Sequence, residues 1–153
     1  MVAERDTGCV MERIQVLLVD DEPAVLRGLR MRLELETDIR VVGEAGDGAT
    51  AVEAARLLSP DVVLMDVNLP GVDGITATRE LAAQVPQAVV VVLSLHDDQE
   101  TIGRALAAGA VAFVGKQQID GDLLAAIRLA ARKPKGGTLD KSTDRRNSRT
   151  GQG

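Results

Sequence analysis

Side chains that suit metal or anion chemistry follow several separate apolar segments of the sequence. Two adjacent carboxylates, Asp20 and Asp21, follow the first segment, and Asp66 follows the third. A hydroxyl, Ser94, and an ammonium, Lys116, follow the fourth and fifth segments. Carboxylate oxygens bind hard divalent cations, and a hydroxyl together with an ammonium group suits an anion. These residue types indicate a metal-assisted reaction at an oxyanion if the chain brings them together.

Each of these residues also has a purely structural explanation. Asp is favoured at helix N-caps and Pro at the first helical position, so a helix starting near Pro23 accounts for one of Asp20 and Asp21 but not for both. A single Ser after a strand is usually a turn former, and a single Lys is usually solvated. The functional interpretation therefore depends on convergence of the whole set.

The elements that must position these residues alternate regularly between residues 14 and 132. Apolar runs of strand length, three of them continuous as in strands covered on both faces, occupy 14–19, 40–42, 62–65, 89–93 and 111–114. Helical patterns with Leu and Ala at spacings of three and four occupy 24–35, 49–58, 75–84, 99–108 and 122–132. This alternation predicts an α/β fold: a doubly wound, flavodoxin-like, five-stranded parallel sheet of order 2-1-3-4-5 with five helices.

That strand order brings the acidic residues together. The first and third strands are neighbours, and their carboxyl ends lie at the same edge of the sheet, so Asp66 is expected beside Asp20 and Asp21. Three close carboxylates repel, which raises a pKa or requires a counter-ion. Mg²⁺ is the simplest such ion, because it accepts carboxylate and carbonyl oxygens and often completes its shell with phosphoryl oxygens.

The composition limits the other function classes. The chain has 153 residues, one Phe, one Cys, and neither Trp nor Tyr, so its core must be aliphatic. No apolar run reaches the length of a membrane span, and we expect a soluble, cytoplasmic protein. The single Cys9 excludes an intrachain disulfide and a zinc site built on several thiolates.

Charge divides the chain into a body and a tail. Residues 1–131 carry 11 basic and 21 acidic side chains, whereas residues 132–153 carry 7 and 2. An acidic body is a poor ligand for nucleic acid. We expect an N-terminal extension at 1–13, one domain at 14–132, and a basic, disordered tail at 133–153, which has no apolar period with which to bury a face.

The set Asp20, Asp21, Asp66, Ser94 and Lys116, each at a predicted strand end, resembles the receiver domain of bacterial two-component response regulators, which are CheY-like. The resemblance covers about residues 13–132. The stretch from Leu93 to Asp98 further resembles receivers of the NarL/FixJ type, which usually carry a helix-turn-helix output domain. The resemblance implies a phosphorelay signalling protein that regulates transcription, and no enzyme apart from its own phosphorylation and slow autodephosphorylation.

The resemblance also implies a role for each residue. Asp66 would accept a phosphoryl group from a histidine kinase or from a small donor such as acetyl phosphate. Asp21, Asp66 and the backbone carbonyl of Asn68 would bind Mg²⁺, with Asp20 acting through water ligands. Lys116 would pair with a phosphoryl oxygen, or with Asp66 before transfer, and Ser94 would donate a hydrogen bond to another phosphoryl oxygen.

A conformational switch and three modulating positions follow from the same likeness. Ser94 would move toward the phosphoryl group and leave space for Phe113, whose alternative role is core packing. Leu95 could restrict access to the phosphoryl group. Asn68 and His96 could tune the attack of water on the acyl phosphate.

Other functions remain open at this point. A haloacid-dehalogenase-like phosphatase also uses a nucleophilic Asp and Mg²⁺, but the second residue after the nucleophile would be an acid, whereas here it is Asn68. The glycines between 43 and 48 have the wrong order for a dinucleotide site and suit a turn. The third alternative is a receiver-like binding module that works without phosphorylation.

The sequence says less about the output domain of the protein and about its partners. The tail contains no helix-turn-helix domain, so the chain is either a stand-alone receiver or part of a longer regulator that binds DNA through another domain. If a homodimer forms, the apolar residues Leu123, Leu124 and Ile127 are a possible interface, although they suit the core equally well.

Overall fold

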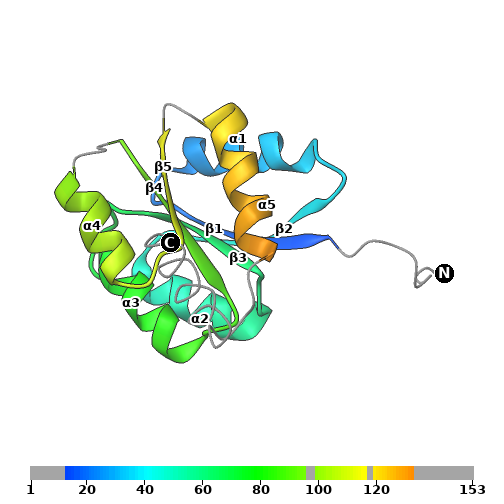
Figure 1. The fold of residues 1–153 in the computed structure, drawn as a ribbon. Coiled ribbons are helices and arrows are strands. Elements are labelled where there is room, and N and C mark those ends of the chain that lie inside the picture. Colours follow the sequence, from blue (N-terminus) through cyan, green and yellow to red (C-terminus); the bar gives the residue numbers. More distant parts are fainter. Residues whose placement is uncertain (1–12, 96–98, 117–118, 133–153) are drawn as a thin grey trace, which may run out of the picture.

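A parallel β-sheet forms the centre of the molecule (Figure 1). The structure is a computed structural model, and it describes residues 13–95, 99–116 and 119–132. The strands are β1 (Ile14–Val19), β2 (Ile39–Ala45), β3 (Val62–Asp66), β4 (Val89–Ser94) and β5 (Ala112–Gly115). They pair in parallel in the order β2-β1-β3-β4-β5, which confirms the predicted topology.

Helices cover both faces of this sheet (Figure 1). On one face lie α1 (Pro23–Glu34) and α5 (Leu124–Arg132). The other face carries α2 (Gly48–Leu58), α3 (Gly74–Gln84) and α4 (Gln99–Ala107). One π-helical turn, Ile119–Leu123, leads into α5. The predicted tail and all but the last residue of the predicted extension lie outside the described residues.

Each face of the sheet has its own aliphatic core. Leu17, Val63 and Val92 pack with small residues of α2 and α3 on one face, and Leu18, Leu64 and Val91 pack with α1 and α5 on the other. All residues of β3 are buried, as predicted for a strand covered on both sides. The sheet is therefore held rigidly from both faces, and its edge offers a firm support for a site.

The suggested dimer interface on α5 is corrected by this packing. Leu123 and Ile127 are fully buried, and Leu124 is buried as well, all within the α1–α5 core. Their spacing places them on the sheet-facing side of the helix, where burial against the strands stabilises the fold. They are core residues and are not accessible to a second copy of the chain.

Local sequence signals explain where the helices begin. The side chains of Asp47 and Asp73 accept hydrogen bonds of 2.8 Å from the backbone N–H groups of Thr50 and Thr76, and so cap α2 and α3. Pro23 stands in the first turn of α1. The glycine-containing stretch from 43 to 48 finishes β2 and turns into α2, which confirms the predicted turn.

Most observed boundaries lie within one residue of the predicted ones, and two elements, β2 and α5, differ by more. β2 extends to Ala45 because Gly43 and Glu44 pair with Leu17 and Leu18 of β1 after a register shift. α5 begins at Leu124, two residues later than predicted. Among the described residues, no helix is both long and apolar enough to cross a membrane.

Candidate functional site

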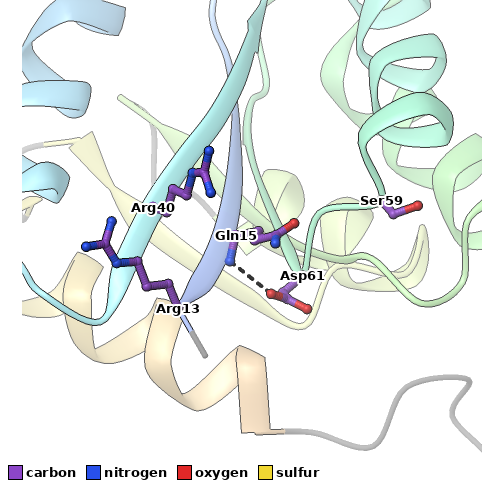
Figure 2. A pocket seen from close by; sticks show the side chains of 5 residues that line it. All are labelled: Arg13, Gln15, Arg40, Ser59 and Asp61. Atoms are coloured by element: carbon purple, nitrogen blue, oxygen red, sulfur yellow. Dashed lines mark hydrogen bonds between the residues drawn. The ribbon is translucent and has the colours of Figure 1, made fainter. Parts of the chain in front are cut away.

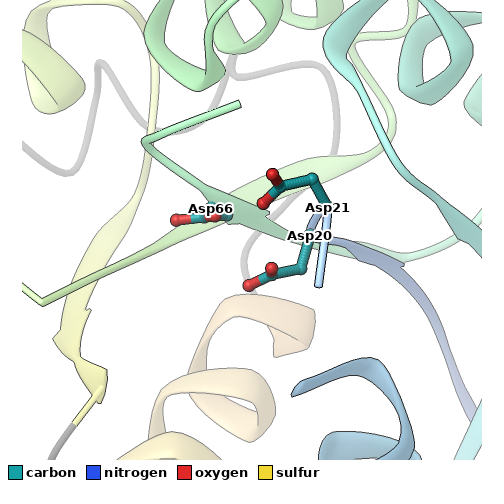
Figure 3. A group of neighbouring side chains, drawn as sticks. All are labelled: Asp20, Asp21 and Asp66. Atoms are coloured by element: carbon teal, nitrogen blue, oxygen red, sulfur yellow. The ribbon is translucent and has the colours of Figure 1, made fainter. Parts of the chain in front are cut away.

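Three carboxylates meet at the carboxyl edge of the sheet, as predicted. Asp66 is the last residue of β3, while Asp20 and Asp21 follow β1, the neighbouring strand. One carboxylate oxygen from each lies within 4.8 Å of the others, and Figure 3 shows the three side chains grouped at the strand ends. Asp20 and Asp66 are almost fully buried, whereas Asp21 is exposed. The group therefore has a buried base and one side open to solvent.

The side chain of Asp20 makes a hydrogen bond within its own loop that does not cap α1. Its Oδ1 accepts a hydrogen bond of 2.9 Å from the N–H of Glu22, while the N-cap position of α1 is Glu22, whose side chain makes no capping bond. Capping therefore accounts for neither Asp20 nor Asp21, which leaves both carboxylates for the chemistry of the site.

Lys116 joins the carboxylates from the end of β5. Its Nζ lies 2.9 Å from Oδ2 of Asp20 and 3.3 Å from Oδ1 of Asp66, and the side chain is only 13% exposed. The expected contact of Lys116 with Asp66 before phosphoryl transfer is therefore present. The ammonium group lies closer to Asp20 than to Asp66, and both carboxylates are buried.

The buried charges shift two pKa values. Burial and the charge of Asp20 raise the pKa of Asp66, although Lys116 and the N–H of Asn68 act in the opposite direction. Burial alone would lower the pKa of Lys116, but its hydrogen bond to Asp20 and the charge of Asp66 outweigh burial and raise it. One ammonium group therefore does not balance the carboxylates, and a bound cation would fit this donor set of oxygens.

Ser94 ends β4 at the same edge. It is 1% exposed, and it lies beside Gly115 of β5 in the register of the two strands. Phe113 lies two residues earlier on β5, opposite Val92, and packs half-buried against the core on the face that carries α2, α3 and α4. The residues predicted to form the switch are thus on adjacent strands, and the ring of Phe113 packs partly against the core.

The loop between β3 and α3 completes the rim. Asn68 is exposed, and its N–H donates a hydrogen bond of 3.3 Å to Oδ1 of Asp66. Leu95, directly after Ser94, is 58% exposed at the other side of the site. His96 lies outside the described residues.

Gly74 is a residue of this site that the sequence analysis missed. A Cβ atom built on Gly74 would lie 2.0 Å from the backbone oxygen of Asp66, and the N–H of Gly74 donates a hydrogen bond of 3.0 Å to the oxygen of Val67. The first turn of α3 therefore lies directly against the end of β3. The available signal was a glycine at a helix start just after the capping residue Asp73.

A second cleft lies at the opposite edge of the sheet and contains none of these residues. It is lined by Arg13, Gln15, Arg40, Ser59 and Asp61, and Asp61 accepts a hydrogen bond of 2.9 Å from the N–H of Gln15 (Figure 2). Its position places it on the far side of the core from Asp66. It has no part in the chemistry of the acidic group.

The sequence as a whole matches a known family. The model of the response regulator receiver domain matches residues 16–128. The chain belongs to the response regulator receiver family. The acidic group, Lys116 and Ser94 all lie inside the matched part of this receiver domain, and the phosphatase and dinucleotide-binding alternatives are thereby excluded.

Two curated relatives of the receiver are transcriptional regulatory proteins. YxjL, a transcriptional regulatory protein of Bacillus subtilis (strain 168), is 39% identical over 121 residues, which are 79% of this chain and 56% of that protein. LiaR of the same organism is 39% identical over 119 residues, covering 78% of this chain and 56% of that protein. The chain thus spans about half the length of the curated relatives it matches.

Solved receiver structures have the same fold. The receiver domain of NarL from Mycobacterium tuberculosis matches with a TM-score of 0.70 and 32% identity, covering 76% of this chain and 98% of that one. A LuxR-family response regulator from Aurantimonas sp. SI85-9A1 matches with a TM-score of 0.76 and 30% identity, covering 91% and 99%. These matches confirm the predicted resemblance to receivers of the NarL type.

Proposed function

We propose that Asp66 accepts a phosphoryl group from a histidine kinase or a small donor such as acetyl phosphate, in a reaction that depends on Mg²⁺. The observation that carries this proposal is the convergence of three carboxylates within 4.8 Å beside the ammonium group of Lys116. Asp66 is the central member, because it ends the strand between the other positions and contacts both Lys116 and the N–H of Asn68.

The donor set suits the metal. In the proposed arrangement, Asp21 and Asp66 supply carboxylate oxygens, Asn68 supplies its backbone carbonyl, and Asp20 acts through water. When bound, Mg²⁺ would neutralise carboxylate charge and draw the phosphoryl oxygens toward Asp66. The raised pKa of Asp66, caused by burial and by Asp20, supports this role, since a neighbouring cation would keep the carboxylate ionised at neutral pH.

The protein residues carry out the transfer by positioning and charge. An Oδ atom of Asp66 attacks phosphorus, the bond from phosphorus to the donor's leaving group breaks, and acetate departs with the electron pair when acetyl phosphate is the donor. The carboxylate needs no general base, so none is required among the neighbouring residues. Lys116 binds one phosphoryl oxygen, and the hydroxyl of Ser94 donates to another.

The acyl phosphate would then alter the neighbouring surface. Ser94 and Phe113 lie on adjacent strands, so a movement of Ser94 toward the phosphoryl oxygens changes the space available to the ring. The surface of α4, β5 and α5 is the part that would respond. Such a switch is a two-state equilibrium, which phosphorylation shifts by its different affinity for the two states.

We further propose that this switch controls transcription. The relatives YxjL and LiaR are transcriptional regulatory proteins, and this chain matches about half of each. DNA binding would require an output domain, and a homodimer would use a surface other than the buried residues of α5. A transcription regulator works where the DNA is, so we propose the cytoplasm as its location.

Intact-mass spectrometry tests the proposal directly. The wild type, Asp66→Asn and the control Asp122→Asn are incubated with acetyl phosphate, with Mg²⁺ and with EDTA. Asp122 is exposed, so its substitution removes the same charge from the surface. We expect a phosphoryl adduct in the wild type and the control with Mg²⁺ only. An adduct that forms equally in Asp66→Asn would contradict the assignment of Asp66.

A further inference from the structure

A cleft of about 410 Å³ continues from the acidic site along the β3–α3 loop. Its lining includes Asp21 and Asn68, both in the proposed metal site, and Arg104, which comes from α4 on a separate part of the chain. Leu69, Pro70 and Ile75 add apolar surface. The cleft therefore connects the site of phosphoryl transfer with a guanidinium group that the transfer itself does not use.

Arg104 adds a positive charge to a cleft whose other charged lining residues are acidic. Asp21 and Asp73 line the cleft, and Asp20 and Asp66 lie buried beside it, so an anionic donor approaches a surface rich in carboxylates. Lys116 is already held between Asp20 and Asp66. Within the described ranges, the side chain of Arg104 makes no hydrogen bond or ion pair, and it is exposed. Its charge is thus available to a ligand in the cleft.

We propose that Arg104 binds an anionic group on the part of the phosphodonor that is not transferred, and so favours acyl phosphates that carry a second carboxylate. This inference rests on the proposed function of Asp66. With the phosphoryl group at Asp66, the leaving group extends toward the cleft, where the apolar residues contact its body and Arg104 pairs with its carboxylate. Arg104 is a specificity residue in this scheme and takes no part in bond making.

A matched pair of donors isolates this contact. Benzoyl phosphate and 4-carboxybenzoyl phosphate differ by one carboxylate, and both transfer their phosphoryl group as the bond from phosphorus to the acyl oxygen breaks. The substituent also changes the leaving group electronically, but this change is the same for every protein variant. The ratio of the two second-order rate constants, compared between variants, therefore reports the contact alone.

The ratio is measured by intact mass in the wild type, Arg104→Gln, Arg104→Lys and the control Arg79→Gln. Arg79 is an exposed arginine of α3 that does not line the cleft. We expect Arg104→Gln to lower the ratio for the carboxylated donor about three- to fivefold, the range for a partly exposed ion pair, and Arg104→Lys to restore part of it. Higher salt should lower the wild-type ratio, and Arg79→Gln should leave it unchanged.

The outcomes separate this inference from the function on which it rests. Equal ratios in the wild type and Arg104→Gln, with both proteins phosphorylated, would overturn the role of Arg104 and leave Asp66 in place. An equal decrease in Arg79→Gln would show a general effect of charge and would also overturn it. Failure of the wild type to accept phosphate from either donor would contradict the proposed function itself.

Discussion

At the scale of single residues, the buried position of Asp66 beside Asp20 makes the stability of the fold depend on the charge of Asp66. Because the pKa of Asp66 is raised, mainly by burial, the native state holds this proton more tightly than the unfolded chain does. Ionisation of Asp66 therefore costs stability. The cost is absent below the unfolded pKa, which is about 3.9, grows as the pH rises through the folded pKa, and is complete above it.

We expect Asp66→Asn to raise the free energy of unfolding of the metal-free protein at about pH 7 by on the order of 1 kcal/mol, because the amide removes the buried charge. The gain should shrink toward about pH 4, near the unfolded pKa, because the folded carboxyl with its raised pKa takes up its proton above that pH. Urea unfolding in EDTA at both pH values measures it, with the exposed Asp122→Asn as control. A less stable Asp66→Asn protein at neutral pH would show that the pairing with Lys116 dominates.

Gly74 supports a second prediction at this scale. A Cβ at this position would meet the backbone of Asp66, so Gly74→Ala must displace either the end of β3 or the first turn of α3. We expect a loss of about 2–4 kcal/mol in the free energy of unfolding and slower phosphorylation by acetyl phosphate.

Gly103 is the matched control for Gly74. It lies in α4 with no neighbouring atom within 4 Å of a built Cβ, so Gly103→Ala should stabilise the protein by about 0.5–1 kcal/mol. Urea unfolding and intact mass measure the effects on stability and on phosphorylation. Equal effects of the two substitutions would contradict the close contact between Gly74 and Asp66.

At the scale of elements, the packing of α5 can be tested by truncation. Ile127 is fully buried, whereas Leu129 on the same helix is 59% exposed. Ile127→Ala should cost about 2–5 kcal/mol through lost burial and a cavity, and Leu129→Ala should stay within about 0.5 kcal/mol of the wild type. Thermal or urea unfolding gives both values. If Ile127→Ala were as stable as the wild type, the assignment of this face to the core would be wrong.

The elements were largely predictable, because the alternation of apolar runs and helical periods is a local signal. β1 was predicted at its observed bounds, and the strand order followed from the general rules for parallel sheets. The end of β2 was not predictable, because Gly43 and Glu44 join the strand through pairing with β1 and carry no local strand signal. The π-helical turn before α5 likewise has no pattern in its residue types.

The residues of the site likewise divide into those that the sequence predicts and those that only the folded chain shows. Asp20, Asp21, Asp66, Ser94 and Lys116 were predictable because each follows a strand, and the sheet brings those ends to one edge. The contact of Lys116 with Asp20 and the role of Gly74 were not, because both depend on distances between atoms of separate elements. Arg104 belongs to this second class, since only the folded chain places α4 beside the β3–α3 loop.

At the scale of the whole molecule, the site and the core are one cooperative unit. The carboxylates follow strands that are buried on both faces, so a ligand of the site stabilises the entire domain by mass action. We expect Mg²⁺ at 100 times its dissociation constant to raise the free energy of unfolding by about 2.7 kcal/mol. Thermal unfolding at several Mg²⁺ concentrations measures this, and EDTA should reverse it.

The control for this linkage is Asp21→Asn, which removes an exposed carboxylate of the proposed metal site and no core contact. Its stability should respond much less to Mg²⁺. An increase of the same size in both proteins would place the metal elsewhere on the molecule.

The half-buried ring of Phe113 has a practical consequence. The chain contains neither Trp nor Tyr, so an indole introduced by Phe113→Trp would be the sole strong fluorophore of the protein. It would lie one strand away from Ser94, where its emission responds to the polarity around it. A stopped-flow trace of that emission would report in real time whether the surroundings of the ring change on phosphorylation, with no background from other chromophores to subtract.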